Sequence, residues 1–190
     1  MKRPVEFYSE GVKLRGDISL PDDRQAGEKR AGVILCHGYT GVKDLYLPDT
    51  ARVLTNQRYM VMTFDYKGWS ESVGPRSRLS PYSRALDVQA AMTCLSLQPE
   101  VQADRLWLSG TSYGGATVCW VGAVGPRPKC IVSVVGVGHS ARWMRSVRRP
   151  GGGRGKLLTL FWCRHTHYPP LHTSPSRGCR ATELRLCTPA

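Results

Sequence analysis

An α/β fold on a mostly parallel sheet is predicted by three features of this sequence. Ala31–Cys36 and Met60–Phe64 are continuous apolar runs, typical of strands buried on both faces. Segments with helical apolar periodicity separate such runs, as in βαβ units. The 190 residues suffice for one sizeable core and are too few for two ordinary domains. We therefore expect a single α/β domain.

The segment before the first buried strand predicts an antiparallel hairpin. Val5–Tyr8 and Val12–Leu20 alternate apolar and polar residues around Gly11. The polar residues from Pro21 to Arg30 then form a loop. The hairpin is expected at an edge of the sheet.

Helices and strands alternate in the rest of the recognisable pattern. Pro48 suits the first turn of a helix, and apolar residues recur from Val88 to Leu95 at positions i, i+3, i+4 and i+7 of a second helix. Six strands and three helices are expected in all, the last being a strand over Arg105–Ser109, a helix over Gly114–Val124 and a strand over Cys130–Val137.

The composition changes near residue 146. Of the formal net charge of +13, most belongs to residues 141–190, where Glu183 is the only acidic residue. We expect a core at 1–146 and a poorly ordered basic tail rich in Pro, Gly and Arg at 147–190. A shifted reading frame or altered splicing, replacing the last strands of the sheet, is one hypothesis for the change. A nucleic-acid-binding arm is a weaker one, because basic and aromatic residues do not interleave, and no nucleic-acid partner is expected.

The cellular compartment is predicted from absent signals and from the cysteines. No leader peptide or apolar run of about 18 residues is present, so a cytoplasmic protein without a membrane partner is expected. Seven cysteines are an odd number, and Cys36, Cys94, Cys119 and Cys130 fall in apolar segments. A disulfide framework is not indicated.

The segment Gly110-Thr111-Ser112-Tyr113-Gly114 carries the chemistry. It matches G-x-S-x-G where a predicted strand ends and a helix begins, a context that lifts a serine hydroxyl above the sheet. Ser112 is therefore the candidate nucleophile. The Tyr113 N–H, at the positive end of the following helix, is one candidate oxyanion donor, and the Tyr39 N–H in the turn after the first buried strand is the other.

These motifs, in their order along the chain, resemble the α/β-hydrolase superfamily. HGYTG after a buried strand, then FDYKGWSES, then RLWLSGTSYGG are similar to its dienelactone hydrolase, prolyl-oligopeptidase-like and acyl-esterase branches, over roughly residues 4 to 146. The resemblance implies a three-layer sandwich lacking its last strands. It also implies a supporting role for Asp65, and it places Lys67, Ser70 and Arg58 where arginine, glycine and glycine are usual.

The resemblance implies hydrolysis of a small carboxylic ester, or less readily a peptide or lactone, through a Ser112 acyl-enzyme. The superfamily's acid and then its histidine follow the nucleophile. Here every later histidine precedes Glu183, the only later carboxylate, and His139 is predicted to line the pocket or the core. The alternative is an inactive hydrolase fold, either a truncated product or a binding protein.

No cofactor or metal is expected, because serine is activated through hydrogen bonds alone. Six residues of the tail are of zinc-ligand types, but their spacing matches no closed four-ligand pattern. They are Cys163, His165, His167, His172, Cys179 and Cys187.

Overall fold

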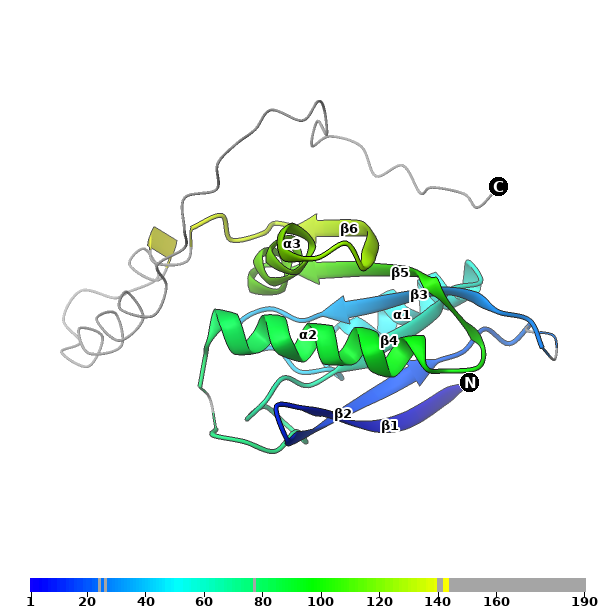
Figure 1. Cartoon of the computed structure of the whole chain (residues 1–190), viewed down its shortest axis with the longest axis horizontal. Coiled ribbons are helices and arrows are strands. Elements are labelled where there is room, and N and C mark those ends of the chain that lie inside the picture. Colours follow the sequence, from blue (N-terminus) through cyan, green and yellow to red (C-terminus); the bar gives the residue numbers. More distant parts are fainter. Residues whose placement is uncertain (24, 26, 77, 140–141, 144–190) are drawn as a thin grey trace, which may run out of the picture.

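The computed structural model describes residues 1–23, 25, 27–76, 78–139 and 142–143 (Figure 1). The predicted tail at 147–190 lies outside these residues. The described elements are β1 (Lys2–Ser9), β2 (Val12–Ser19), β3 (Arg30–Cys36), α1 (Leu47–Asn56), β4 (Met60–Phe64), α2 (Pro81–Ser96), β5 (Val101–Thr111), α3 (Tyr113–Val124) and β6 (Pro128–Val134). The α/β fold is confirmed.

The strands form one mixed sheet in the order β1-β2-β4-β3-β5-β6. β1 and β2 pair antiparallel and β2 joins β4 antiparallel, which confirms the predicted edge hairpin. The other pairs, β3 with β4, β3 with β5 and β5 with β6, are parallel. The carboxyl ends of β3, β4 and β5 therefore lie together at one edge, where ligands bind in such sheets.

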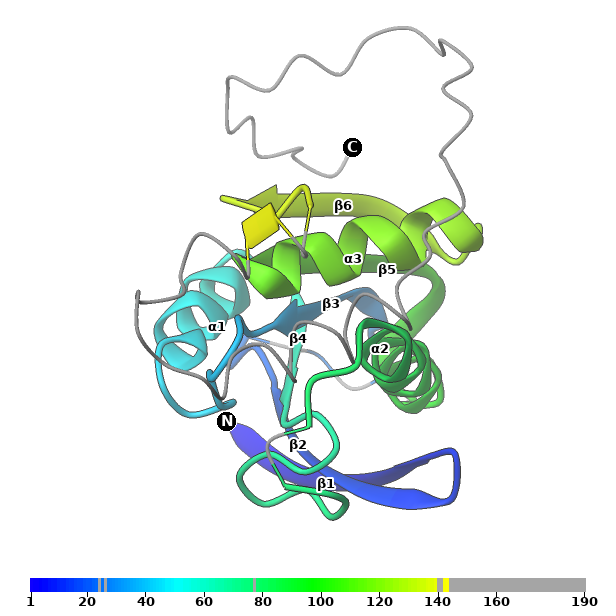
Figure 2. The ribbon, with the colours of Figure 1, turned by 90° about the vertical axis from the view of Figure 1, so that its left-hand side faces the viewer.

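Two cores cover the two faces of the sheet. Because successive side chains of a strand point to opposite faces, Ile34 and Cys36 of β3 pack with α2 in the larger core, whereas Val33 and Leu35 pack with α1 in the smaller one. Figure 2 shows α1 and α2 on opposite sides of the strands. The sequence predicted this layering from the buried runs.

β6 differs from its prediction. It ends at Val134, three residues before Val137, because Val135 adopts a positive φ of 45° that extended backbone does not allow. It is the outermost strand of the described sheet, and Val132 and Val134 are exposed. An apolar edge strand of this kind is an aggregation hazard.

Two residues that stand where the superfamily usually has glycine adopt a left-handed backbone conformation in the structure. Arg58 has φ 69° and Ser70 has φ 42°. Arg58 follows α1, and its N–H donates to the Thr55 carbonyl while its side chain pairs with Asp23 at the surface. A side chain with a Cβ is disfavoured in this conformation.

Arg58→Gly is expected to raise the free energy of unfolding by about 0.5–1 kcal/mol, because relief of left-handed strain exceeds the entropy that glycine adds to the unfolded chain. The exposed pair with Asp23 contributes little. Urea unfolding measures the change. Gln57→Gly is the control, since Gln57 has φ −91° and glycine there should destabilise. Equal losses in both variants would contradict the interpretation.

Candidate active site

The turn between β5 and α3 holds Ser112 in a strained conformation. Ser112 has φ 55° and ψ −118°, which residues with a Cβ rarely adopt. Its N–H donates to the Val134 carbonyl of β6 at 2.9 Å, and its own carbonyl accepts from Ala116 and Val137, both at 3.3 Å. Hydrogen bonds to α3 and to β6 and its following residues therefore hold the strained backbone in place.

Glycines around Ser112 allow the backbones to approach closely. A Cβ on Gly110 would lie 2.3 Å from the Gly114 carbonyl oxygen, and a Cβ on Gly114 would lie 2.2 Å from that of Cys36. On Gly115 it would lie 2.7 Å from the Ser133 hydroxyl. No side chain fits where α3 starts against β3 and β6, so the motif's glycines are required by packing.

The loop after β3 lies beside Ser112. A Cβ on Gly38 would be 3.5 Å from the Ser112 Cβ, and the Gly38 N–H donates to the Tyr46 hydroxyl at 2.9 Å. The next residue, Tyr39, has a backbone N–H that meets no acceptor within the described residues. The loop predicted to carry one oxyanion donor and the turn predicted to carry the other are thus brought together.

His37 is a buried, neutral residue that shapes this loop. Its Nδ1 lies 2.9 Å from the Gly38 carbonyl oxygen, and because a carbonyl only accepts, Nδ1 carries the proton. Burial, with a smaller contribution from the Arg84 charge, lowers the pKa of His37 to about 3, against the opposing effect of the Gly38 hydrogen bond. Gly41 packs on the imidazole, since a Cβ there would lie 3.0 Å from the His37 Cβ.

Arg84 of α2 was not among the predicted site residues. It is 2% exposed, and its Nη2 donates to the carbonyls of His37 at 2.7 Å and Gly38 at 3.2 Å. Its guanidinium lies 3.6 Å above the centroid of the Tyr66 ring. The sequence did contain a signal: Arg84 stands four residues before Val88, on the apolar stripe of the helix, where a charge needs a special partner.

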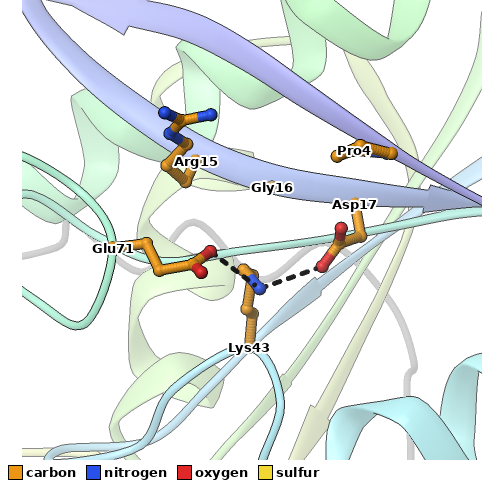
Figure 3. Close-up of a pocket in the computed structure, with 6 residues that line it drawn as sticks. All are labelled: Pro4, Arg15, Gly16, Asp17, Lys43 and Glu71. Carbon is orange, nitrogen blue, oxygen red and sulfur yellow. Dashed lines mark ion pairs between the residues drawn. The ribbon is translucent and has the colours of Figure 1, made fainter.

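Lys43 fixes the middle of the same loop (Figure 3). Its backbone N–H donates to the Asp65 carboxylate at 2.8 Å. Burial alone lowers the pKa of the Lys43 ammonium, but hydrogen bonds with carboxylates outweigh this and raise it. The Lys43 ammonium forms ion pairs with Asp17 of β2 at 3.1 Å, with the neighbouring Asp44 at 2.6 Å and with Glu71 at 3.1 Å. These residues, except Asp44, line a cavity of about 440 Å³.

Asp65 stands where the superfamily resemblance implied a supporting residue. Besides accepting from Lys43, it accepts the Ser72 hydroxyl at its backbone carbonyl, at 2.6 Å. Burial raises the pKa of its carboxyl, against the hydrogen bond from Lys43. These contacts tie the end of β4 to the loops on either side of it.

His139 is exposed, so the predicted core position is wrong. Its Nδ1 accepts from the Arg142 N–H at 3.2 Å, and its carbonyl accepts from the Trp143 N–H at 3.0 Å. The Trp143 ring lies 5.7 Å from the Tyr39 ring, which is also 6.3 Å from Trp69. Aromatic rings therefore gather around the Tyr39 side chain.

Within the described ranges, no cluster of three metal-ligating side chains occurs and no helix is both long and apolar enough to cross a membrane. The six zinc-type residues of the tail lie outside these ranges. Cys36, Cys94 and Cys119 are free thiols. Cys119 is exposed although it falls in an apolar segment of the sequence. Burial raises the pKa of the Cys36 thiol to about 12.

Comparison with known proteins identifies the class. The family profile described as serine aminopeptidase, S33, matches residues 27–159, so the chain belongs to this α/β-hydrolase family. The match begins after the hairpin and runs past residue 146, where the sequence resemblance was expected to stop. The predicted superfamily is confirmed.

The individual relatives are longer proteins. An uncharacterised 31.7 kDa protein of Escherichia coli is 39% identical over 70% of this chain and 45% of its own length. A thiohydrolase of Aspergillus aculeatus is 32% identical over 68% of this chain and 40% of its own. The crystal structure of a hypothetical protein of Pseudomonas aeruginosa superposes with a TM-score of 0.73 at 27% identity, covering 85% of this chain and 50% of that one. The chain spans about half the length of these three relatives, or less.

The buried His37 predicts a stability that falls in acid. Because its pKa is about 3 when folded and about 6.5 when unfolded, the unfolded state binds the proton more tightly. The stability from neutral His37 is complete above pH ~6.5 and is lost as pH falls toward 3, by about 1.4 kcal/mol per pH unit. Urea unfolding from pH 7 to 4 should show a shallower decline in His37→Asn. The exposed His139→Asn is the control, and parallel declines in wild type and His37→Asn would refute the assignment.

Proposed function

We propose that the chain carries the nucleophile and oxyanion site of a serine hydrolase that acts on small carboxylic esters. Ser112 is the nucleophile, and the N–H groups of Tyr39 and Tyr113 are the oxyanion donors. The observation that carries the proposal is the strained Ser112, held at φ 55° between β5 and α3 beside the Gly38 loop. Strain of this kind persists where the surrounding structure imposes it, and it clusters at active sites.

In the proposed reaction the Ser112 Oγ attacks the ester carbonyl carbon, and its proton passes to a base. The carbonyl oxygen becomes an oxyanion that the two N–H groups stabilise, aided by the positive end of α3. The carbon–oxygen bond to the leaving alcohol then breaks, and the alcohol takes up the proton. Water hydrolyses the acyl-enzyme and restores the Ser112 hydroxyl.

The base and the acid of this mechanism are not found among the described residues. His37 is buried and makes its hydrogen bond with Gly38. His139 is exposed, and its Nδ1 accepts from the Arg142 N–H. No carboxylate follows Ser112 in the described part of the chain. This observation favours the second candidate function, a hydrolase fold that binds ligands at the same site without turning them over.

The proposed substrate class is broad. The similarity to a thiohydrolase extends the proposal from oxygen esters to thioesters, and the S33 description adds peptides as a less favoured class. Thioesters suit the same mechanism, because a thiolate is a good leaving group. The aromatic rings of Tyr39, Trp69 and Trp143 favour an apolar or aromatic acyl group. We propose the cytoplasm as the compartment, consistent with the free thiols of Cys36, Cys94 and Cys119.

A fluorophosphonate probe tests the nucleophile directly. The folded 190-residue chain should be labelled at Ser112, as located by peptide mass spectrometry, and Ser112→Ala should lose the label completely. Ser109→Ala, at a serine of β5 three residues earlier, is the matched control and should keep it. Labelling of wild type implies that a base is supplied, and the histidines at 165, 167 and 172 would be substituted next. A folded wild type that resists the probe would support the non-catalytic candidate.

A further inference from the structure

Arg84 holds the backbone that precedes the proposed oxyanion donor. A single nitrogen, Nη2, donates to the carbonyls of both His37 and Gly38, and the Gly38 carbonyl also accepts from His37 Nδ1. The Gly38 carbonyl belongs to the same peptide unit as the Tyr39 N–H. Two donors from different parts of the fold therefore fix the orientation of one peptide plane.

The geometry of the peptide bond carries this constraint to Tyr39. No cis peptide bond occurs in the described residues, and in a planar trans peptide the N–H points opposite to the C=O. Because the Gly38 carbonyl faces the buried Arg84 and His37, the Tyr39 N–H faces the other way. Tyr39 is only partly buried, and its N–H has no acceptor among the described residues. The hydrogen bonds of the Gly38 carbonyl therefore leave the Tyr39 N–H of the same peptide available to a ligand.

A comparison with Arg30 shows how unusual the surroundings of Arg84 are. Arg30, 5% exposed at the start of β3, pairs with the carboxylates of Asp23 and Glu28. No carboxylate of the described chain pairs with Arg84, and its Nε and Nη1 are buried without a hydrogen-bond partner there. Among the described residues, two carbonyls and the faces of the Tyr66 and Tyr113 rings compensate the charge. Such burial is costly, which motivates a role for Arg84 beyond stability.

We propose that Arg84 is a positioning residue: by binding the His37 and Gly38 carbonyls it orients the Gly38–Tyr39 peptide so that the Tyr39 N–H serves as an oxyanion donor at Ser112. The inference rests on the proposed function for the role of that donor. Arg84 touches no reacting atom in this scheme. Arginine suits the task because its fork reaches two carbonyls and stays charged when buried, whereas lysine offers a single point of attachment.

The test combines NMR with probe labelling on the full 190-residue chain. In Arg84→Met the Tyr39 amide and Gly38 carbonyl signals should shift, double or broaden, because the peptide is no longer held in one orientation. Fluorophosphonate labelling of Ser112, normalised to the folded fraction, should slow about 100-fold, as for loss of one oxyanion donor. In Arg84→Lys the signal changes and the labelling rate should be intermediate between those of wild type and Arg84→Met. This variant keeps the test usable if Arg84→Met does not fold.

Arg30→Met is the matched control, since it removes a buried arginine at the opposite end of β3. It should lower stability while leaving the Tyr39 signal and the labelling rate unchanged. Unchanged Tyr39 and Gly38 signals in both Arg84 variants would overturn the inference, as would altered signals with an unaltered labelling rate. If the probe does not label wild type, the proposed function fails. The Tyr39 NMR signal then decides by itself whether Arg84 orients the Gly38–Tyr39 peptide.

Discussion

The contact of the Gly114 backbone with the end of β3 is the constraint on which the rest of the site depends. A Cβ at Gly114 would overlap the carbonyl oxygens of Cys36 and His37, so the start of α3 and the end of β3 meet main chain to main chain. This approach brings the Gly38 loop beside Ser112. The left-handed turn at Ser112 joins β5 to a helix that starts so close to the sheet, and the bonds to Val134 and Ala116 hold it there. Site geometry is in this sense a result of backbone packing.

The loop between β3 and α1 contains no helix or strand, yet three charged or polar side chains fix it. Arg84 and His37 hold its first peptides from inside the molecule, and Lys43 ties its middle to β2, to the end of β4 and to the loop that follows β4. Both anchoring charges are buried, and they are treated differently. Lys43 is surrounded by carboxylates, whereas Arg84 is compensated by carbonyls and aromatic faces. A carboxylate placed next to Arg84 would compete with the His37 and Gly38 carbonyls for the guanidinium N–H groups that orient the loop.

The described sheet carries the proposed nucleophile and oxyanion elements, and no carboxylate follows Ser112 among the described residues. The longer relatives match over 40–50% of their own length, and β6, at the edge of the described sheet, has exposed apolar side chains. The proposed nucleophile can therefore be considered apart from the groups that would activate it. That separation is the reason why labelling and substrate turnover are distinct questions for it.

The sequence by itself determined the α/β class, the order of the described elements, the edge hairpin and the serine turn, because buried runs, helical periodicity and glycines are local patterns. Arg58 and Ser70 were also recognisable as strained, since glycine is usual there. The early end of β6 and the exposure of His139 and Cys119 were not predicted, because they depend on neighbours in space. Only the tertiary structure revealed what Arg84 binds, because its two carbonyl partners lie 46 and 47 residues away in the chain. The role of a side chain can be predicted from local sequence when its partners are adjacent in the chain. When its partners are distant in the chain, only the fold decides that role.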